Sequence, residues 1–308
     1  MDHPSVEAKG RYHSERSEEA LIYSLAKAQA KASSQSKRSE IEGSRGNTFG
    51  CSTGFLDFAR NDTVKLPPFS IVIPCFNEEA RIGETLRVTV DYLSTNAPDS
   101  ELIVVNDGST DATGTVARER LKSAQINARL LENFPNRGKG AAVRSGLLAA
   151  QQPIGLFSDA DLSTPLEETA KLIWPIANDE VDIAFGSRAL DRSLIGVHQP
   201  WRREQAGRIF NLLVRIATGL PFWDTQCGFK AFRLDACRPI LEAAHIEGFA
   251  FDVELLSLAR RAGLRIREVP VRWNHAEGSK VSFLRDSLRM LREVIALRRG
   301  TTASQPPS

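Results

Sequence analysis

The chain has 308 residues, of which 42% are hydrophobic and 25% are charged. This is the composition of an ordinary globular protein, long enough to bury a sizeable core in one large domain or two smaller ones. A net charge of +2 argues against a nucleic-acid-binding protein driven by bulk basicity, so no nucleic-acid partner is expected.

The best candidate for a membrane span, residues 20–32, is interrupted by Lys27 and Lys31. It is too short for the roughly 20 apolar residues of a transmembrane helix, and too short for a secretory signal. The cysteines show no metal-binding or disulfide spacing, and they are Cys51, Cys75, Cys227 and Cys237. We therefore expect a cytoplasmic protein without zinc, whose contact with a membrane is peripheral.

The first 65 residues differ in composition from the rest of the chain. Residues 1–65 are rich in Ser, Arg, Lys, Glu and Gly, and their apolar periodicity does not extend beyond one short helix. We expect a disordered extension, or a start codon assigned too far upstream, that carries none of the chemistry.

From Phe69 onward, short apolar runs alternate with amphipathic segments. The runs predict strands at 70–74, 101–105, 129–132 and 155–158, separated by helices at 78–93, 111–122 and 138–151. This alternation predicts an α/β fold with a mostly parallel central sheet and helices on both faces. Ligands in such sheets bind at the carboxyl ends of the strands.

Polar residues follow the predicted strands where that rule expects them, at 74–79, 106–111 and 159–161. Asp107 is placed to accept hydrogen bonds from a base or a ribose, and Gly108 allows a close approach to backbone N–H groups. An Asx-type turn with Thr110 or Asp111 capping the next helix is equally compatible with this segment.

The segment L-F-S-D-A-D-L-S-T, residues 156–164, places two carboxylates after a buried strand. In an extended chain Asp159 and Asp161 point to the same side, about 6 to 7 Å apart along the strand. Such hard oxygen ligands suit Mg²⁺ or Mn²⁺, which complete their coordination with water and phosphate oxygens. The alternative is a turn followed by a helix that Ser163 or Thr164 caps ahead of Pro165.

The segment N-R-G-K-G, residues 136–140, matches neither the P-loop nor the dinucleotide-binding pattern. It predicts a flexible basic loop whose helix N-terminus attracts an anion through free N–H groups. Lys139 would neutralise a nucleotide, or would be a solvated surface lysine.

Three motifs together carry a family resemblance: I-V-I-P-C-F-N-E-E at 71–79, V-V-N-D-G-S-T-D at 104–111 and D-A-D-L-S-T at 159–164. They resemble the family 2 nucleotide-sugar glycosyltransferases with the GT-A fold. Four further blocks look like the dolichyl-phosphate β-glucosyltransferase branch: G-S-R at 186–188, D-T-Q-C-G-F-K at 224–230, F-A-F-D-V-E at 249–254 and E-G-S-K-V at 277–281. The resemblance covers residues 66–298.

The resemblance implies transfer of a sugar, glucose from UDP-glucose, to a dolichyl or polyprenyl phosphate. By motif match, Pro74, Glu78 and Asp107 hold the uridine. Asp159 and Asp161 engage the diphosphate and its Mg²⁺ or Mn²⁺, with Asp161 the more direct ligand. The mannosyl branch often carries a Gln two places after the second Asp. This chain has Ser163 at that position.

The chemistry of a phosphate acceptor points to arginine. A phosphate monoester is mostly dianionic at neutral pH and is already a nucleophile, so it needs positioning more than a general base. We expect Arg188 and Arg203 to hold it through their forked donors, with Lys280 as a third contact. In-line attack predicts inversion at the sugar, giving a β-linked product.

The acidic pair in F-D-V-E leaves several roles open. Asp252 is expected to orient the sugar among the catalytic residues, but Asp252 or Glu254 could instead be a general base or could cap a helix over 251–262. Cys227 is predicted to be a small packing residue. His198 and His275 either touch phosphate or are solvated.

The last predicted element, residues 281–299, has an apolar stripe flanked by arginines. Such a basic amphipathic helix either lies on an anionic bilayer at the cytoplasmic face or packs its stripe on the domain, and 300–308 would form a flexible tail. The alternatives to the main function are another donor such as a mannose nucleotide, a hydroxyl acceptor, or a non-catalytic nucleotide-sugar-binding protein.

Overall fold

The structure is a computed structural model that describes residues 65–197, 201–275, 290 and 292–294, without the side chains of 201–204 and 206. The predicted extension up to residue 64, the tail at 300–308, His198, Lys280 and most of the predicted helix at 281–299 lie outside the described residues. Of that helix, Met290 and Val294 are described and are buried in the core, which favours packing on the domain at these two positions.

A seven-stranded sheet forms the centre of the fold, in the order β3-β2-β1-β4-β7-β5-β8. All of its strands run in the same direction except β7, which is antiparallel to both of its neighbours. The strands are β1 (Ser70–Cys75), β2 (Glu101–Asp107), β3 (Asn127–Asn133), β4 (Ile154–Ser158), β5 (Ile183–Ser187), β7 (Phe229–Arg233) and β8 (Ile266–Pro270). A separate two-stranded sheet pairs β6 (Ile195–Val197) with β9 (Trp273–Asn274).

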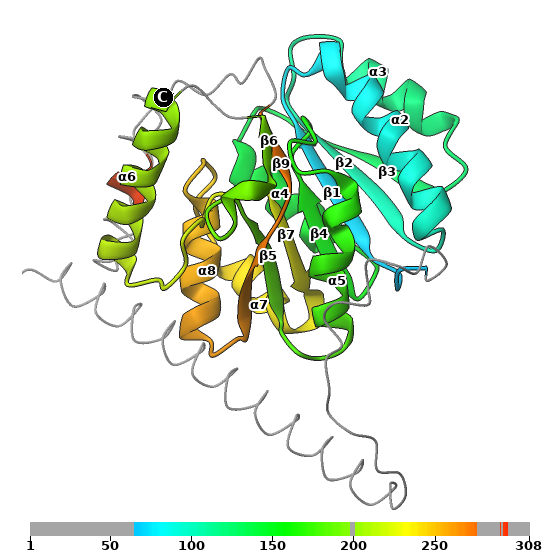
Figure 1. Cartoon of the computed structure of the whole chain (residues 1–308). Coiled ribbons are helices and arrows are strands. Elements are labelled where there is room, and N and C mark those ends of the chain that lie inside the picture. Colours follow the sequence, from blue (N-terminus) through cyan, green and yellow to red (C-terminus); the bar gives the residue numbers. More distant parts are fainter. Residues whose placement is uncertain (1–64, 198–200, 276–289, 291, 295–308) are drawn as a thin grey trace, which may run out of the picture. The chain divides into compact units, whose positions relative to one another are not determined.

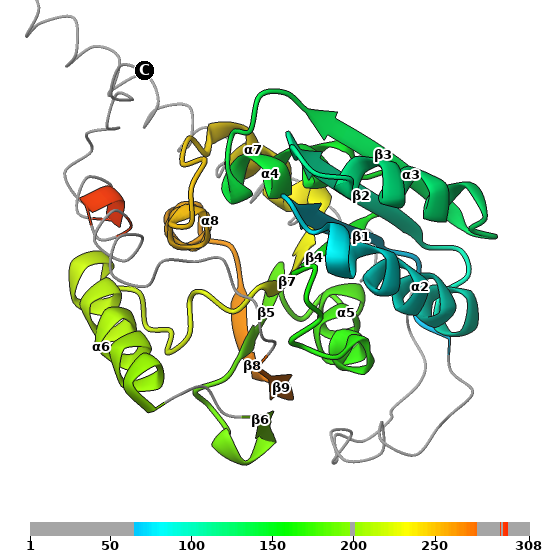
Figure 2. The same ribbon diagram turned by 90° about the horizontal axis from the view of Figure 1, so that it is seen from above.

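Helices cover both faces of the sheet, as Figures 1 and 2 show. One face carries α2 (Glu79–Asn96), α3 (Thr113–Lys122) and α5 (Thr169–Ala177). The other carries α4 (Lys139–Ala149), α7 (Leu234–Ala243) and α8 (Phe251–Arg261), with α6 (Trp201–Thr218) beyond α8. Two short 3₁₀ helices are η1 (Leu166–Glu168) and η2 (Arg192–Leu194). The predicted α/β architecture is confirmed.

The central strands are apolar on both faces because each face is covered. Along β1, Ile71 and Ile73 enter the core under α2 and α5, whereas Val72 enters the core under α4. Every residue of β1, β2 and β4 is buried, which explains why these strands read as continuous apolar runs instead of alternating patterns. Among the helices that the structure describes, none is long and apolar enough to cross a bilayer.

The order of the strands creates a switch point at β1. The chain steps outward from β1 to β2 and β3, and then returns through α4 to place β4 on the other side of β1. Pairing of β1 with β2 continues to Cys75 and Asn106, but pairing with β4 ends at Val72 and Phe157. The carboxyl ends of β1 and β4 therefore part at the position where open α/β sheets bind their ligands.

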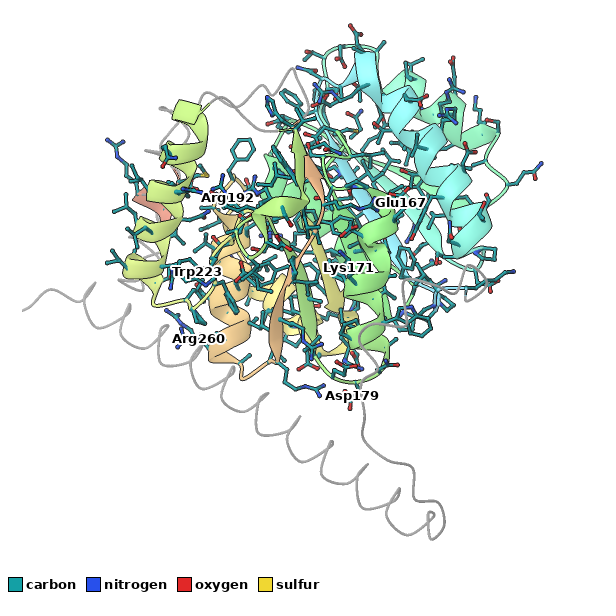
Figure 3. All side chains as sticks on the ribbon, viewed as in Figure 1. Glu167, Lys171, Asp179, Arg192, Trp223 and Arg260 are labelled. Atoms are coloured by element: carbon teal, nitrogen blue, oxygen red, sulfur yellow. The ribbon has the colours of Figure 1, made fainter. Side chains whose placement is uncertain are left out.

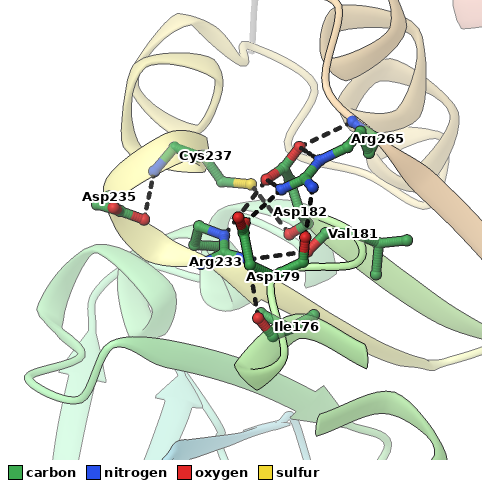
Figure 4. A network of polar contacts seen from close by, with 9 residues as sticks. Ile176, Asp179, Val181, Asp182, Arg233, Asp235, Cys237 and Arg265 are labelled. Atoms are coloured by element: carbon green, nitrogen blue, oxygen red, sulfur yellow. Dashed lines mark hydrogen bonds and ion pairs between the residues drawn. The ribbon is translucent and has the colours of Figure 1, made fainter. Parts of the chain in front are cut away.

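At the other end of the strands, where β5 and β8 begin, an ion-pair network joins β5, β7 and β8 (Figure 4). The Asp182 carboxylate accepts hydrogen bonds from the Arg265 backbone N at 2.9 Å and from its guanidinium Nε at 3.1 Å, and it pairs with Arg233. Burial opposes the charge, but the Arg265 donors lower the pKa of Asp182 below its usual range. Because this network is remote from the strand carboxyl ends, its role is stability.

Asp182→Asn should lower the free energy of unfolding at pH 7 by about 1.5–3 kcal/mol, because charged hydrogen bonds are lost. A depressed folded pKa stabilises the protein above the unfolded pKa of about 3.9, and this stability is lost as pH falls through the folded value. Urea unfolding at pH 7 and at pH 3 should therefore show a difference between variant and parent that shrinks in acid. The control Asp91→Asn, which breaks an exposed pair with Arg87, should change little.

Candidate active site

The loops that follow β1 and β2 are tied into one rim. Asn77, with a φ of 54°, accepts a hydrogen bond from the Thr110 backbone N at 2.8 Å and donates its own N–H to Ser109 Oγ at 2.9 Å. Glu79 accepts from the Ala112 backbone N at 2.9 Å. This rim therefore presents the ends of two neighbouring strands as a single rigid edge.

The Asx-turn alternative for the second loop is confirmed at one position. The Asp111 carboxylate accepts a hydrogen bond from the Thr113 backbone N at 3.0 Å. Helix α3 begins after Ala112, which provides no side-chain cap, so capping by Thr110 is wrong, whereas Asp111 binds the first N–H of the helix, that of Thr113.

Asp107 is the last residue of β2, and its carboxylate holds the loop that follows β3. It is 2% exposed and accepts hydrogen bonds from Asn133 Nδ2 at 3.0 Å, Asn136 Nδ2 at 3.0 Å and the Gly138 backbone N at 2.6 Å. Gly108 allows this approach, because a Cβ there would lie 2.5 Å from the Asn136 backbone N. The close approach predicted at Gly108 is thus made by the protein's own loop.

At the N-terminus of α4, three N–H groups that the sequence predicted to be free for an anion have partners within the chain. The Gly138 N–H donates to Asp107, and those of Gly140 and Ala141 donate to the Glu247 carbonyl at 2.7 and 3.3 Å. The prediction of a flexible anion-binding loop is wrong at this point, because a carboxylate and a carbonyl of the same chain already occupy the donors.

The two aspartates of D-A-D lie in a turn and not in an extended strand. Strand β4 ends at Ser158, and the Leu162 N–H donates to the Asp159 carbonyl at 3.1 Å, with Leu162 at a φ of 47°. The same-side extended geometry predicted for the pair is therefore wrong. Asp161 accepts from the Ser163 backbone N at 2.9 Å, so the turn alternative holds.

The helix-cap alternative for this segment is wrong. The first helical turn after the aspartates, η1, starts behind Pro165 and has no side-chain cap from Ser163 or Thr164. Thr85 instead fastens the turn to α2 by donating to the Ala160 carbonyl at 2.5 Å. A cavity of about 420 Å³ borders Asp161 between α2 and this turn.

Asp159 is confined between a lysine and a glycine. Lys139 Nζ lies 2.6 Å from Asp159 Oδ1, and the Asp159 N–H donates to the Gly228 carbonyl at 3.0 Å. A Cβ at position 228 would lie 2.0 Å from Asp159 Oδ2, so only glycine leaves this carboxylate its place. Burial opposes the charge of Lys139, but the carboxylates of Asp159, Asp252 and Asp161 raise its pKa. Lys139 is thus a paired cation and not a solvated lysine.

Arg188 stands directly after β5 and is held by Asp224. Its Nε and Nη2 donate to the two oxygens of Asp224 at 2.7 and 2.8 Å, and its backbone N donates at 2.9 Å. Asp224 is 1% exposed, whereas the Arg188 side chain is 30% exposed. Glu268 fixes this arrangement by accepting from the Asp224 backbone N at 2.7 Å and from Ser187 Oγ at 2.7 Å.

The predicted convergence of carboxylates and guanidinium groups is present for the residues that the structure describes. Asp159 and Arg188 follow β4 and β5, the two strands that flank β7, and the 224–228 segment connects them, because Asp224 binds Arg188 and the Gly228 carbonyl accepts from the Asp159 N–H. Burial opposes the charge of Arg188, but Asp224 and, more weakly, Asp159 raise its pKa. The Trp273 ring lies 5.5 Å from the Arg188 guanidinium carbon, and His275 stacks on that ring.

A buried lysine that sequence reasoning missed lies beneath the site. Lys230 is fully buried, and its Nζ lies 2.7 Å from Asp252 Oδ1 and donates to the Cys227 carbonyl at 2.5 Å. Its ammonium also lies 5.3 and 5.8 Å from the rings of Phe157 and Phe185. The signal was present, because a lysine in the apolar run F-K-A-F requires a buried carboxylate partner.

Asp252 is the partner of Lys230, and it does not cap α8, whose first turn has no side-chain cap. Burial raises the pKa of Asp252, while Lys230 and Lys139 oppose that rise. At 3% exposure the carboxylate lies behind the open surface of the site. Glu254 accepts hydrogen bonds from the backbone N atoms of His245 and Ile246, so it anchors the loop ahead of α8.

The remaining predicted residues occupy varied positions. Pro74 is buried within β1, and Glu78 pairs with Arg81 at 2.7 Å at the start of α2. Burial raises the pKa of Cys227 to about 12, so this thiol is a packing residue as predicted. Arg203 belongs to α6, but its side chain is outside the described residues, as is Lys280.

The donor set of the site fits a hard divalent cation. Asp159 and Asp161 supply carboxylate oxygens, and no cluster of three His, Cys, Asp or Glu side chains occurs in the described ranges. Mg²⁺ and Mn²⁺ accept such a set, because they use one or two carboxylates and complete their coordination with substrate phosphates and water.

The chain is similar to known glycosyltransferases in both its family-model match and its curated relatives. The model of the family described as Glycosyl transferase family 2 matches residues 70–241. A dolichyl-phosphate beta-glucosyltransferase of Drosophila melanogaster is 38% identical over 264 residues, covering 79% of this chain and 80% of that protein. One from Trichomonas vaginalis is 37% identical over 221 residues, covering 69% and 67%.

Among solved structures, a glucosyl-3-phosphoglycerate synthase from Mycobacterium tuberculosis superimposes with a TM-score of 0.57. It is 21% identical, the match covers 77% of this chain and 81% of that one, and that structure contains Mn²⁺, UDP-glucose and phosphoglyceric acid. The likeness shows the fold, and it confirms the predicted GT-A-type architecture.

Gly228→Ala should weaken binding of UDP with Mn²⁺ by about 10- to 100-fold, because the new methyl displaces the Asp159 carboxylate. Stability should change little, since a flexible side chain can rotate away. Titration calorimetry and thermal unfolding measure the two effects separately. The control Gly207→Ala, which meets no atom within 4 Å, should leave the affinity unchanged and should raise stability by up to about 1 kcal/mol, because alanine favours the interior of helix α6. Unchanged affinity in Gly228→Ala would contradict the metal-binding assignment of Asp159.

Lys230→Met should destabilise the protein by about 3–5 kcal/mol at pH 7, because it leaves a buried carboxylate without its counter-charge. The double variant with Asp252→Asn should be less destabilised than Lys230→Met alone. Without Lys230 the folded pKa of Asp252 rises further, so the single variant is most stable below the unfolded pKa of about 3.9 and loses stability as pH rises through the folded value.

Urea unfolding across pH 4 to 8 measures this coupling, with the exposed Lys122→Met as control. Additive effects of the two substitutions would show that the pair does not interact.

Proposed function

Because the chain belongs to glycosyl transferase family 2, we propose that it transfers glucose from UDP-glucose to the phosphate of a dolichyl or other polyprenyl phosphate. The product would be a β-linked lipid-phosphate sugar. The observation that carries the proposal is that Asp159 and Arg188, a carboxylate for the donor's metal and a guanidinium for a second anion, follow the two strands that flank β7 and are connected through the 224–228 segment. The named activity of the curated relatives supports the same acceptor.

The donor side is formed by the residues around the D-A-D turn. Asp159 and Asp161 would hold Mg²⁺ or Mn²⁺, which when bound would neutralise the diphosphate of UDP as it leaves. Lys139, kept cationic by three carboxylates, would add a positive charge beside the same oxygens. The uridine would lie toward the ends of β1 and β2, near Pro74 and Glu78.

Asp107 would contribute to the uridine site mainly by holding the 133–138 loop in place beside it. Its carboxylate already accepts hydrogen bonds from the 133–138 loop and is 2% exposed. Asp252 would act in a comparable way on the sugar side, as a buried positioning residue. It raises the pKa of Lys139 and thereby helps to keep that ammonium charged and in place.

The acceptor side depends on Arg188. Its bonds to Asp224 use Nε and Nη2, which leaves Nη1 for a phosphate oxygen. A phosphate dianion positioned there would attack the anomeric carbon from the side opposite UDP, with inversion, and would need no base to remove a proton. Arg203 and Lys280 are the proposed second and third contacts.

The acceptor is a membrane lipid, so the enzyme would work at a membrane surface. We place it at the cytoplasmic face as a peripheral protein, because UDP-glucose is the donor proposed for it. Vesicles that carry polyprenyl phosphate are therefore the natural medium for its assay.

The direct test is incubation of the purified chain with UDP-glucose, Mg²⁺ and a short polyprenyl phosphate. The expected product is acid-labile, lipid-linked glucose, and its formation should stop when EDTA removes the metal. Binding of UDP-glucose without turnover on any acceptor would support a non-catalytic binding protein instead. Faster turnover with a mannose nucleotide, or with a hydroxyl acceptor, would replace the proposed substrates.

Arg188→Lys should lower kcat/KM for the lipid phosphate by about 100-fold, because a lysine cannot pair with Asp224 and hold a phosphate at once. Binding of UDP should be unchanged, since Arg188 is assigned to the acceptor. The control Arg118→Lys, on the exposed pair with Glu132, should behave like the parent. An equal loss of UDP binding in Arg188→Lys would place this arginine on the donor side.

A further inference from the structure

Helix α6 carries an apolar stripe that faces outward. Ile209, Leu212, Leu213 and Ile216 follow the i, i+3, i+4, i+7 spacing of one helix face, and they are 60, 53, 40 and 66% exposed. Another face of the same helix packs normally, because Phe210 and Val214 are buried in the core. One apolar face therefore packs the helix on the core, and a second apolar face is exposed to solvent.

This exposure is concentrated in one part of the molecule. Of the ten large apolar side chains exposed among the described residues, seven lie between positions 190 and 223. They comprise the α6 stripe together with Leu190, Val197 and Trp223. The four stripe residues share one helix face, and apolar side chains that lie together in this way mark an interaction site, whereas single exposed residues do not.

Basic and aromatic groups accompany the stripe. Helix α6 contains four arginines against one acidic residue, Glu204, and its described arginines are Arg208 and Arg215. The Arg215 guanidinium lies 3.9 Å from the ring centre of Trp223, which is 54% exposed and follows the helix (Figure 3). Trp and Arg at the rim of an apolar surface suit the boundary between anionic headgroups and acyl chains.

We propose that α6 is an interfacial helix that lies in the plane of an anionic lipid surface, with its stripe inserted at the headgroup boundary. This inference rests on the proposed function, which requires a lipid acceptor. The position of α6 at the outer edge of the fold fits this role (Figures 1 and 2). A second copy of the chain fits less well, because a stable interface buries about 800 Å² per partner, more than four half-exposed side chains supply.

The chain segment that contains α6 connects to the proposed acceptor site at both of its ends. The segment that contains α6 starts after Arg188 and returns to the site at Asp224, and these two residues form the bidentate ion pair. Trp223 directly precedes Asp224, and both of their backbone N–H groups are fixed by Glu268. A lipid surface under α6 would therefore lie beside Arg188, so a lipid phosphate could reach the guanidinium while its chain stays in the bilayer.

The test is cosedimentation of the full chain with vesicles of phosphatidylcholine and phosphatidylglycerol. The double variant Ile209→Ser and Ile216→Ser should bind these vesicles about tenfold more weakly, because its two most exposed stripe residues no longer insert. The control Phe134→Ser removes a side chain that is 93% exposed on another loop, and it should bind like the parent. Thermal unfolding and near-ultraviolet circular dichroism confirm that the variants are folded.

A second variant examines the basic rim without touching the stripe. Arg208→Gln combined with Arg215→Gln should reduce binding to the anionic vesicles, and the parent's binding should weaken as salt is raised. Binding of the parent to pure phosphatidylcholine should be weaker than to the anionic mixture. Equal binding to neutral and anionic vesicles would overturn the choice of an anionic surface.

The inference is overturned if the stripe variant binds as tightly as the parent, or if Phe134→Ser loses as much. It is also overturned if light scattering shows a lipid-free dimer that the stripe variant dissociates. Glucose transfer distinguishes docking from catalysis: the stripe variant should keep the parent's rate on a short, water-soluble prenyl phosphate and lose rate only with vesicles. A parent that transfers no glucose but needs its stripe for vesicle binding would refute the proposed function and leave the docking surface standing.

Discussion

The Asp159 carboxylate is the constraint on which the site depends, because it is where the two halves of the sheet meet. Lys139 approaches it at 2.6 Å from α4, and Gly228 allows it to stay where any larger residue would displace it. The charge of Asp159 also raises the pKa of Arg188, which follows β5. One carboxylate thus links the part of the sheet built on β1 to β4 with the part built on β5, β7 and β8.

The molecule keeps this arrangement by giving each buried charge a partner within the chain. Lys230 is paired with Asp252, Asp224 with Arg188, and Asp107 with the donors of the 133–138 loop. An unpaired charge in these positions would cost several kcal/mol, roughly. Positions are therefore fixed by electrostatics as well as by packing.

The stabilising ion-pair network and the candidate active site lie at opposite ends of the strands. The Asp182 network lies where β5 and β8 begin, and the D-A-D turn and Arg188 lie where β4 and β5 end. The chain after Arg188 continues outward through α6, whose second apolar face is largely exposed among the described residues. The proposed transfer to a lipid phosphate would require such a division, because the surface that meets a bilayer has to remain next to the reacting phosphate.

The sequence by itself determined the order of strands and helices from Ser70 to Ser158, because buried strands and amphipathic helices leave local apolar patterns. It also placed Asp107 and Asp159 after strand ends, and its motifs indicated the family. Tertiary structure alone decided what each side chain does. Lys230 and Asp252 are 22 positions apart, and the donors on Asp107 come from a different strand and loop. Burial and pairing of this kind depend on contacts between distant segments, which no local pattern encodes.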